Sequence, residues 1–298
     1  MKPKAEKIIF AVVCAAVVVG GFQALIYILN LYQIGIFIIT ADVIYLFLAF
    51  NIIFLYDLHF KTHPGKELSL KPALVARTEH FWSLRYIGRY FNYLLLPTLI
   101  FWSTVIVLYL NFGHVKIQQS IALFSSIALV AAYWYIKEIF SRRAEIVDIE
   151  IFVRMTVIKI YSAGLAYAAA MALMRSSYCL SSYYYAGVVF AITFSLIFQA
   201  LFQHRLNSNK NLLITAGISL LQAVAGFFVY RFWGLNFYTA AILLVIIYNL
   251  MWGVFHYYLD GALTKKAFLE ILIISLLTAA MIFGATNFRA RILDNCLY

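Results

Sequence analysis

The feature that most constrains this sequence is a series of apolar segments, each of about 20 residues or more. A segment of this length can cross a bilayer as an α-helix, in which every backbone hydrogen bond is made internally. The segments do not alternate polar and apolar residues as membrane β-strands do. They lie at residues 8–30, 34–56, 91–112, 117–137, 155–174, 182–203, 211–231, 236–258 and 267–287. The sequence therefore predicts an all-α, polytopic transmembrane helical bundle of about nine spans.

The overall composition agrees with lipid rather than water as the surrounding medium. Of the 298 residues, 65% are hydrophobic and 12% are charged, whereas a soluble domain is roughly half apolar and a quarter charged. The nine segments and their short connections use most of the chain, so we expect a single transmembrane domain over residues 1–298. The net charge of +11 comes from basic residues between the apolar segments, and we expect no nucleic-acid partner.

The distribution of Lys and Arg predicts the orientation. With nine spans and a cytoplasmic N-terminus, eighteen of the 23 basic residues lie on the cytoplasmic side and five lie outside. Cytoplasmic connections of membrane proteins are enriched in Lys and Arg. This topology places the N-terminus inside and the C-terminus outside.

Two cytoplasmic connections carry most of the polar residues. The second half of the first, near residues 72–90, is apolar and basic and contains Phe81, Trp82 and Tyr86. That composition predicts an amphipathic segment lying at the membrane interface before the third span. The second connection, residues 137–159, mixes acidic and basic side chains and suits an interfacial helix or a solvated loop.

Asp42 lies well inside the second predicted span. A charged residue at such a depth costs about 2.5–3.5 kcal/mol, usually faces the bundle interior and often marks an ion or substrate pathway. We expect Asp42 to have this position, as an intramembrane transport site or as a hydrogen-bonded contact between helices. The polar residues that could partner it are Asn51, Asn92, Gln199, Gln222 and Asn249.

Histidines gather at the predicted cytoplasmic side. His256 and Asp260 are at positions i and i+4, so they share one face of a helix at the end of the eighth span. A carboxylate in this position orients an imidazole and raises its basicity. Gly261 is expected to end the helix. Together with His80 in the first cytoplasmic connection, these residues form a predicted catalytic site, and His80 and His256 are candidate ligands for a metal ion. The alternative is that they are interfacial polar residues.

The segment from His256 to Gly261 resembles a His-x-x-x-Asp-Gly segment in a group of bacterial multi-pass membrane proteins. Some members of the group carry labels taken from membrane carotenoid oxygenases. An earlier segment of the group, with a His followed by a Tyr, is similar to His80 through Tyr86. The group often has a second His beside the first, where this chain has Phe255. The resemblance implies a histidine-lined site near one face of a bacterial cytoplasmic (inner) membrane.

Three function classes follow from these patterns. The first is a lipid- or isoprenoid-directed membrane protein that uses His80, His256 and Asp260 at the cytoplasmic face. The second is a secondary transporter or flippase that uses Asp42. The third is a structural or assembly component of an envelope complex, with membrane lipids and another membrane protein as partners. The sequence contains no nucleotide-binding loop, Gly-x-Ser-x-Gly or His-Glu-x-x-His motif.

Overall fold

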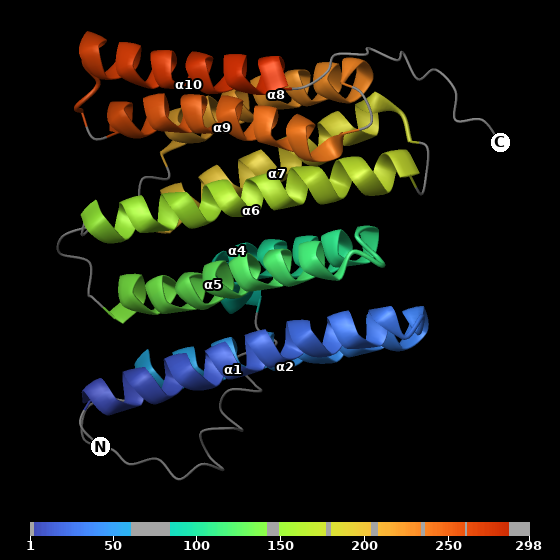
Figure 1. Cartoon of the computed structure of the whole chain (residues 1–298). Helices are drawn as coiled ribbons and strands as arrows, with labels where there is room; N and C mark the ends of the chain where they lie inside the picture. Colours follow the sequence, from blue (N-terminus) through green and yellow to red (C-terminus); the bar gives the residue numbers. More distant parts are fainter. Residues whose placement is uncertain are drawn as a thin grey trace. The chain divides into compact units, whose positions relative to one another are not determined.

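The computed structural model describes residues 3–60, 84–141, 149–176, 180–203, 208–233, 236–259 and 261–285. In these residues the chain forms nine α-helices and no strand (Figure 1). The helices are α1 (Pro3–Asn30), α2 (Ile34–Phe60), α4 (Leu84–Leu110), α5 (Val115–Ser141), α6 (Ile149–Ser176), α7 (Ser182–Gln203), α8 (Asn209–Phe232), α9 (Phe237–Leu259) and α10 (Lys265–Ala285). Each of the nine predicted segments coincides with one of these helices.

The helices have the length and surface of membrane spans. They contain between 21 and 28 residues, and at about 1.5 Å per residue even the shortest matches a hydrocarbon core of about 30 Å. Within the described residues, seven helices contain an apolar stretch long enough to cross a membrane, and α2 and α4 contain shorter ones. Large apolar side chains remain exposed on most of them, as lipid contact requires. The chain is a helical membrane bundle.

The predicted interfacial segment near residues 72–90 falls largely outside the described residues, which begin again at Leu84. From Leu84 to Tyr90 the backbone is already the first part of α4, and this helix continues through Pro97 to Leu110. Proline cannot donate the backbone hydrogen bond expected at its position, but the loss of one bond does not end the helix here.

The chain divides into two compact units, Met1–Ile158 and Lys159–Tyr298, called unit 1 and unit 2 below. In unit 1, α5 packs against both α1 and α4, and α1 also packs against α2. Polar side chains join these helices inside an apolar core: the Thr104 hydroxyl lies 2.8 Å from that of Ser125, and the Asn30 amide donates to Gln118 over 3.1 Å. The single domain predicted over residues 1–298 stays a prediction.

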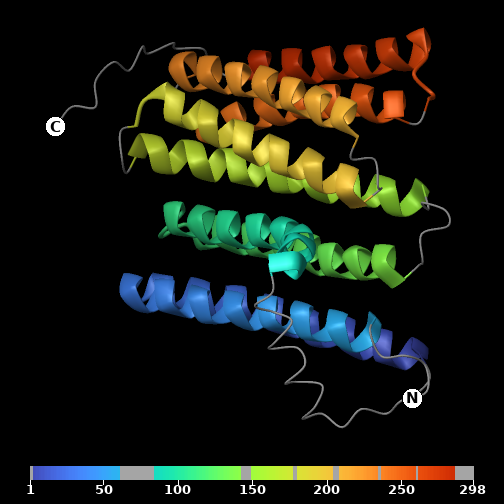
Figure 2. The ribbon, with the colours of Figure 1, turned by 180° about the vertical axis from the view of Figure 1, so that it is seen from behind.

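In unit 2 the closest helix pair is α7 and α8, which lie side by side (Figure 2). Small side chains allow this approach: a Cβ atom added to Gly226 would lie 3.0 Å from a methyl carbon of Val189. Ser219 and Ala223 occupy the same buried face of α8. Small residues are the usual means of close helix packing in membranes. α9 packs against α8 and α10.

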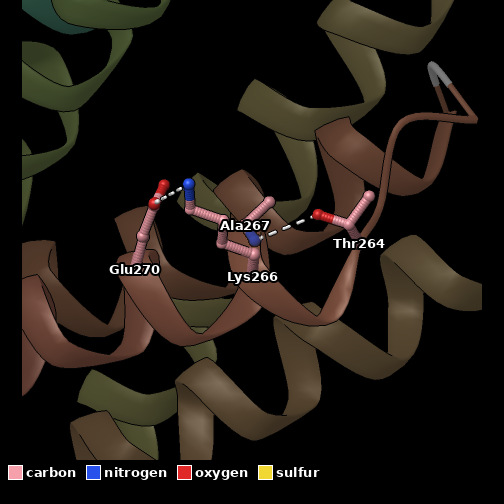
Figure 3. A network of polar contacts seen from close by, with 4 residues as sticks. All are labelled: Thr264, Lys266, Ala267 and Glu270. Atoms are coloured by element: carbon pink, nitrogen blue, oxygen red, sulfur yellow. Dashed lines mark hydrogen bonds and ion pairs between the residues drawn. The ribbon is translucent and has the colours of Figure 1, made fainter.

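The turn between α9 and α10 is defined by two capping features. Gly261 has the left-handed φ of 65°, and backbone bonds from Gly261 to Tyr258 and from Ala262 to Tyr257 close the last turn of α9. The prediction that Gly261 ends this helix is confirmed. The Thr264 hydroxyl accepts a hydrogen bond from the Ala267 amide over 3.1 Å and so begins α10 (Figure 3).

Candidate functional site

An apolar groove lies in unit 2 between α8, α9 and α10. It has a volume of about 440 Å³, which is within the range of small-molecule sites, roughly 300–1,000 Å³. Its lining residues are almost entirely hydrocarbon at the surface: Ile214, Ile218, Leu221, Leu250, Met251, Val254, Phe255, Tyr258, Leu263, Phe268 and Leu272. The capped turn after α9 contributes Leu263, so the local sequence at Gly261 and Thr264 shapes this end of the groove.

Cationic side chains gather at the end of the groove where α8 and α10 begin. The Nζ atom of Lys210 lies 5.5 Å from the centre of the Tyr258 ring, a cation–π geometry. Lys265 is three residues before Phe268 on α10, so the two share one face of that helix. Lys266 pairs with Glu270, with 3.9 Å between Nζ and Oε1 (Figure 3). The predicted topology places this basic end at the cytoplasmic side of the membrane.

His256 lies on a different face of α9 from the groove. It is half-buried, and its ring stacks on Trp252 with centroids 6.2 Å apart. Tyr248, Trp252 and His256 follow at intervals of four residues, so they form one face of the helix. Asp260 and His80 lie outside the described residues. The predicted His/Asp pair, the metal ion and the catalytic role therefore stay predictions.

Asp42 is exposed on α2 in unit 1. Its neighbours on that surface are apolar and also exposed, with Ile39 at 64% and Val43 at 60%. The expected burial of this carboxylate inside the bundle is thus not seen in unit 1. Among its proposed partners, the side chain of Gln222 donates to the Leu244 carbonyl over 2.7 Å in unit 2. The predicted transport role of Asp42 is not tested by this position.

A buried polar cluster in unit 2 was not predicted from the sequence. Its members are Tyr167, Thr193, Gln222 and Tyr248, one from each of α6 to α9, and all are fully buried. The hydroxyls of Tyr167 and Thr193 lie 2.7 Å apart, and the Gln222 and Tyr248 side chains lie near Tyr167. Among the described residues, Gln222 Oε1 and Tyr248 Oη have no hydrogen-bond partner. Hydrogen bonds of this kind hold membrane helices together.

Lys159 and Ser162 are two further buried polar residues of α6, with Lys159 only 3% exposed. Residue 159 is the last of the mixed-charge connection 137–159 and falls at the start of the predicted span 155–174, and neither position gave a reason to expect a buried lysine. The available signal was spacing, because Lys159 and Ser162 are three residues apart and share one helix face. A hydropathy profile shows that Lys159 and Ser162 are polar, but it does not show in which direction their side chains point.

No protein-family model, curated protein or solved structure matches the chain. The resemblance carried by His256 through Gly261 therefore remains an expectation.

Proposed function

We propose that this multi-pass membrane protein is lipid-directed and binds one chain of an anionic lipid or isoprenoid in the groove of unit 2. The observation that carries the proposal is the combination of an apolar groove of about 440 Å³ with a basic end at Lys210. An ordinary lipid-facing surface would supply exposed apolar side chains without this concavity and without a fixed cation at one end.

The lining of the groove suits a hydrocarbon chain. Leu221, Met251 and Phe268 come from three different helices and contribute no polar group, so a polar solute would lose its hydrogen bonds to water on entry. A lipid enters sideways from the bilayer and keeps an apolar environment throughout. The lipid gains binding free energy because its hydrocarbon chain packs more closely against the protein than against other lipids.

The basic end of the groove suits a phosphate head group. Lys210 is exposed and lies over the Tyr258 ring, and a phosphate at this level would meet its ammonium group as a charge-assisted contact. Lys265, one helical turn from Phe268, adds a second cation on the same side. The predicted topology assigns the bound lipid to the cytoplasmic leaflet of a cytoplasmic membrane, where His256 lies near the same end of α9.

Photocrosslinking tests this proposal at the level of single helices. The protein is reconstituted in phosphatidylcholine nanodiscs that contain a phosphatidylglycerol probe with a diazirine in its acyl chain, and crosslinked peptides are mapped by mass spectrometry. We expect crosslinks in α8, α9 and α10, competed by unlabelled phosphatidylglycerol. Competition by a long-chain isoprenyl monophosphate instead would identify an isoprenoid as the ligand.

Leu221 and Leu220 provide a matched pair for the groove, because they are 63% and 60% exposed on the same helix and only Leu221 lines it. Leu221→Trp fills the groove and should remove the crosslinks, whereas Leu220→Trp should retain them. Lys210→Gln should weaken competition by the anionic lipid about tenfold, as expected for a lost hydrogen bond to a charged group. Lys116→Gln, an exposed lysine of unit 1, is the control. Equal crosslinking in both Trp variants would refute the proposal.

A further inference from the structure

Asp42 lies on a face of α2 that the rest of unit 1 does not cover. The buried side of this helix is formed by Phe37, Ala41 and Leu48, which are at most 4% exposed. Asp42 is rotated from Ala41 by about 100° around the helix axis and is exposed. None of the residues that the structure describes forms a hydrogen bond or an ion pair with its carboxylate. The carboxylate therefore stands on the surface of unit 1 with no charge to balance it.

The position of Asp42 along α2 makes this exposure costly. It lies eight residues after Ile34, the first residue of the helix and of its apolar stretch, which is about 12 Å along the axis. Half of the hydrocarbon core is about 15 Å thick, so the carboxylate lies near the middle of the membrane. Lipid tails offer neither a cation nor a hydrogen-bond donor at this depth, and an acidic side chain inside a membrane usually pairs with another group. The exposed face of α2 therefore requires a partner that supplies such a group.

The residues around Asp42 have the spacing of a helix-packing surface. Ile39, Val43 and Leu46 are 64%, 60% and 64% exposed. Ile39, Asp42 and Leu46 follow one another at intervals of three and four residues, the spacing along which one helix packs on another. Gly35 continues this row and is exposed, and a Cβ atom added to it would meet no described atom within 4 Å. The packing of unit 1 thus does not require a glycine at this position, whereas a second helix can approach closely there.

We propose that this face of α2, formed by Gly35, Ile39, Asp42, Val43 and Leu46, is a docking surface for a transmembrane helix of another membrane protein. The partner helix carries a lysine or an arginine that pairs with the Asp42 carboxylate near the middle of the membrane. A basic side chain at this depth needs a counter-charge as much as an acidic one does, so the ion pair satisfies both residues and fixes the register of the two helices. The inference does not depend on the lipid groove of unit 2.

Charge selects a basic helix of another protein over the other possible occupants of this face. A second copy of the chain in a symmetric dimer would place its own carboxylate against Asp42, because residues 34–49 contain no Lys, Arg or His. Among the described residues of the helices, every Lys and Arg lies within two turns of a helix end except Lys159, which is buried. A lipid head group brings its cation no deeper than the edge of the hydrocarbon core.

Site-specific photocrosslinking of the full-length protein in its native membranes tests the proposal. The photoreactive residue p-benzoylphenylalanine replaces either Ile39 or Val43, on the two sides of Asp42. We expect both positions to crosslink to the same second protein, within a transmembrane helix that has a Lys or Arg within one turn of the crosslinked residue, as mapped by mass spectrometry. Phe124 is the matched control position, because it is 60% exposed in the same unit and lies nine residues into α5, a similar depth. The same replacement there should give no crosslink to that protein.

Substitutions of Asp42 separate an ion pair from a purely apolar contact. Asp42→Asn removes the charge with little change in size, and the crosslink yield should fall about tenfold. Asp42→Glu keeps the charge and should retain most of the crosslink. Asp42→Lys should abolish it, and an aspartate in place of the partner's basic residue should then restore it. Because Asp42 is exposed, these variants should keep the fold, and circular dichroism of the purified proteins checks this.

The outcomes bear on this surface alone and leave the lipid groove of unit 2 to its own experiment. Crosslinks only to lipid, within the same chain or to a second copy of it would overturn the proposal. A partner helix without a basic residue near the crosslink would also overturn it. A crosslink yield that is unchanged in Asp42→Asn would show that apolar contact alone holds the two helices, and the assigned role of Asp42 would be wrong.

Discussion

The tight contact between α7 and α8 predicts opposite effects for the same substitution at two glycines of α8. A Cβ atom at Gly226 would lie 3.0, 3.2 and 3.3 Å from three carbon atoms of Val189, inside the ordinary contact distance of about 3.5–4.0 Å. Val189 is fully buried and β-branched, so it cannot rotate away freely. A Cβ atom at Gly217, on the exposed face of α8, meets no described atom within 4 Å.

The expected change in the free energy of unfolding has two contributions, one from helix propensity and one from packing. Alanine favours the helix over glycine by about 0.5–1 kcal/mol at either position. At Gly226 this gain is opposed by an overpacking cost of about 1–3 kcal/mol. Gly217→Ala should therefore stabilise the protein by up to about 1 kcal/mol. Gly226→Ala should be less stable than Gly217→Ala by about 1–3 kcal/mol.

Unfolding by sodium dodecyl sulfate in mixed micelles, followed by circular dichroism, measures both free energies under the same conditions. Combining Gly226→Ala with Val189→Ala completes a double-mutant cycle. The smaller side chain should remove the overpacking, so the two substitutions should couple favourably. A Gly226→Ala variant as stable as Gly217→Ala would refute the close packing of these helices.

Two further substitutions test other parts of unit 2. Gly261→Ala should destabilise the turn after α9 by about 1–2 kcal/mol, because a side chain is strained at a φ of 65°, and Gly261→Asn should recover part of that loss in the same assay. Thr193→Val removes the partner of Tyr167 and should cost about 0.5–2 kcal/mol. Thr278→Val is its control, because among the described residues the Thr278 hydroxyl donates to a carbonyl of its own helix, that of Ile274, at 2.7 Å. Equal losses in the two threonine variants would show that the Tyr167 contact contributes nothing.

Hydropathy was sufficient to predict where the helices lie. Each predicted segment coincides with a helix because a long apolar run in lipid must satisfy its own backbone hydrogen bonds. The differences are at the ends. α4 begins at Leu84 rather than near residue 91, and α6 begins at Ile149, before Arg154. A helix continues after its side chains become polar until a turn residue ends it, and hydropathy does not report that point.

The directions in which side chains point could not be predicted in the same way. A soluble helix has a polar face that identifies its buried side, whereas a membrane helix is apolar all round. Asp42 was expected to be interior and is exposed on α2, and Lys159 was assigned only to a span end and is buried. The groove of unit 2 was missed for the same reason, since Leu220 and Leu221 are equivalent in sequence and only Leu221 lines it.

Both proposals depend on a membrane-spanning chain, and the lipid proposal also depends on a groove whose basic end is at the cytoplasmic side. Single cysteines at Lys116→Cys and Lys265→Cys, in a background without the three native cysteines, test this most directly by labelling intact cells with a membrane-impermeant thiol reagent. We predict that position 116 is labelled in intact cells and that position 265 is labelled only after permeabilisation. Labelling at 265 and protection at 116 in intact cells would reverse the orientation, and labelling of both positions would contradict the membrane topology itself.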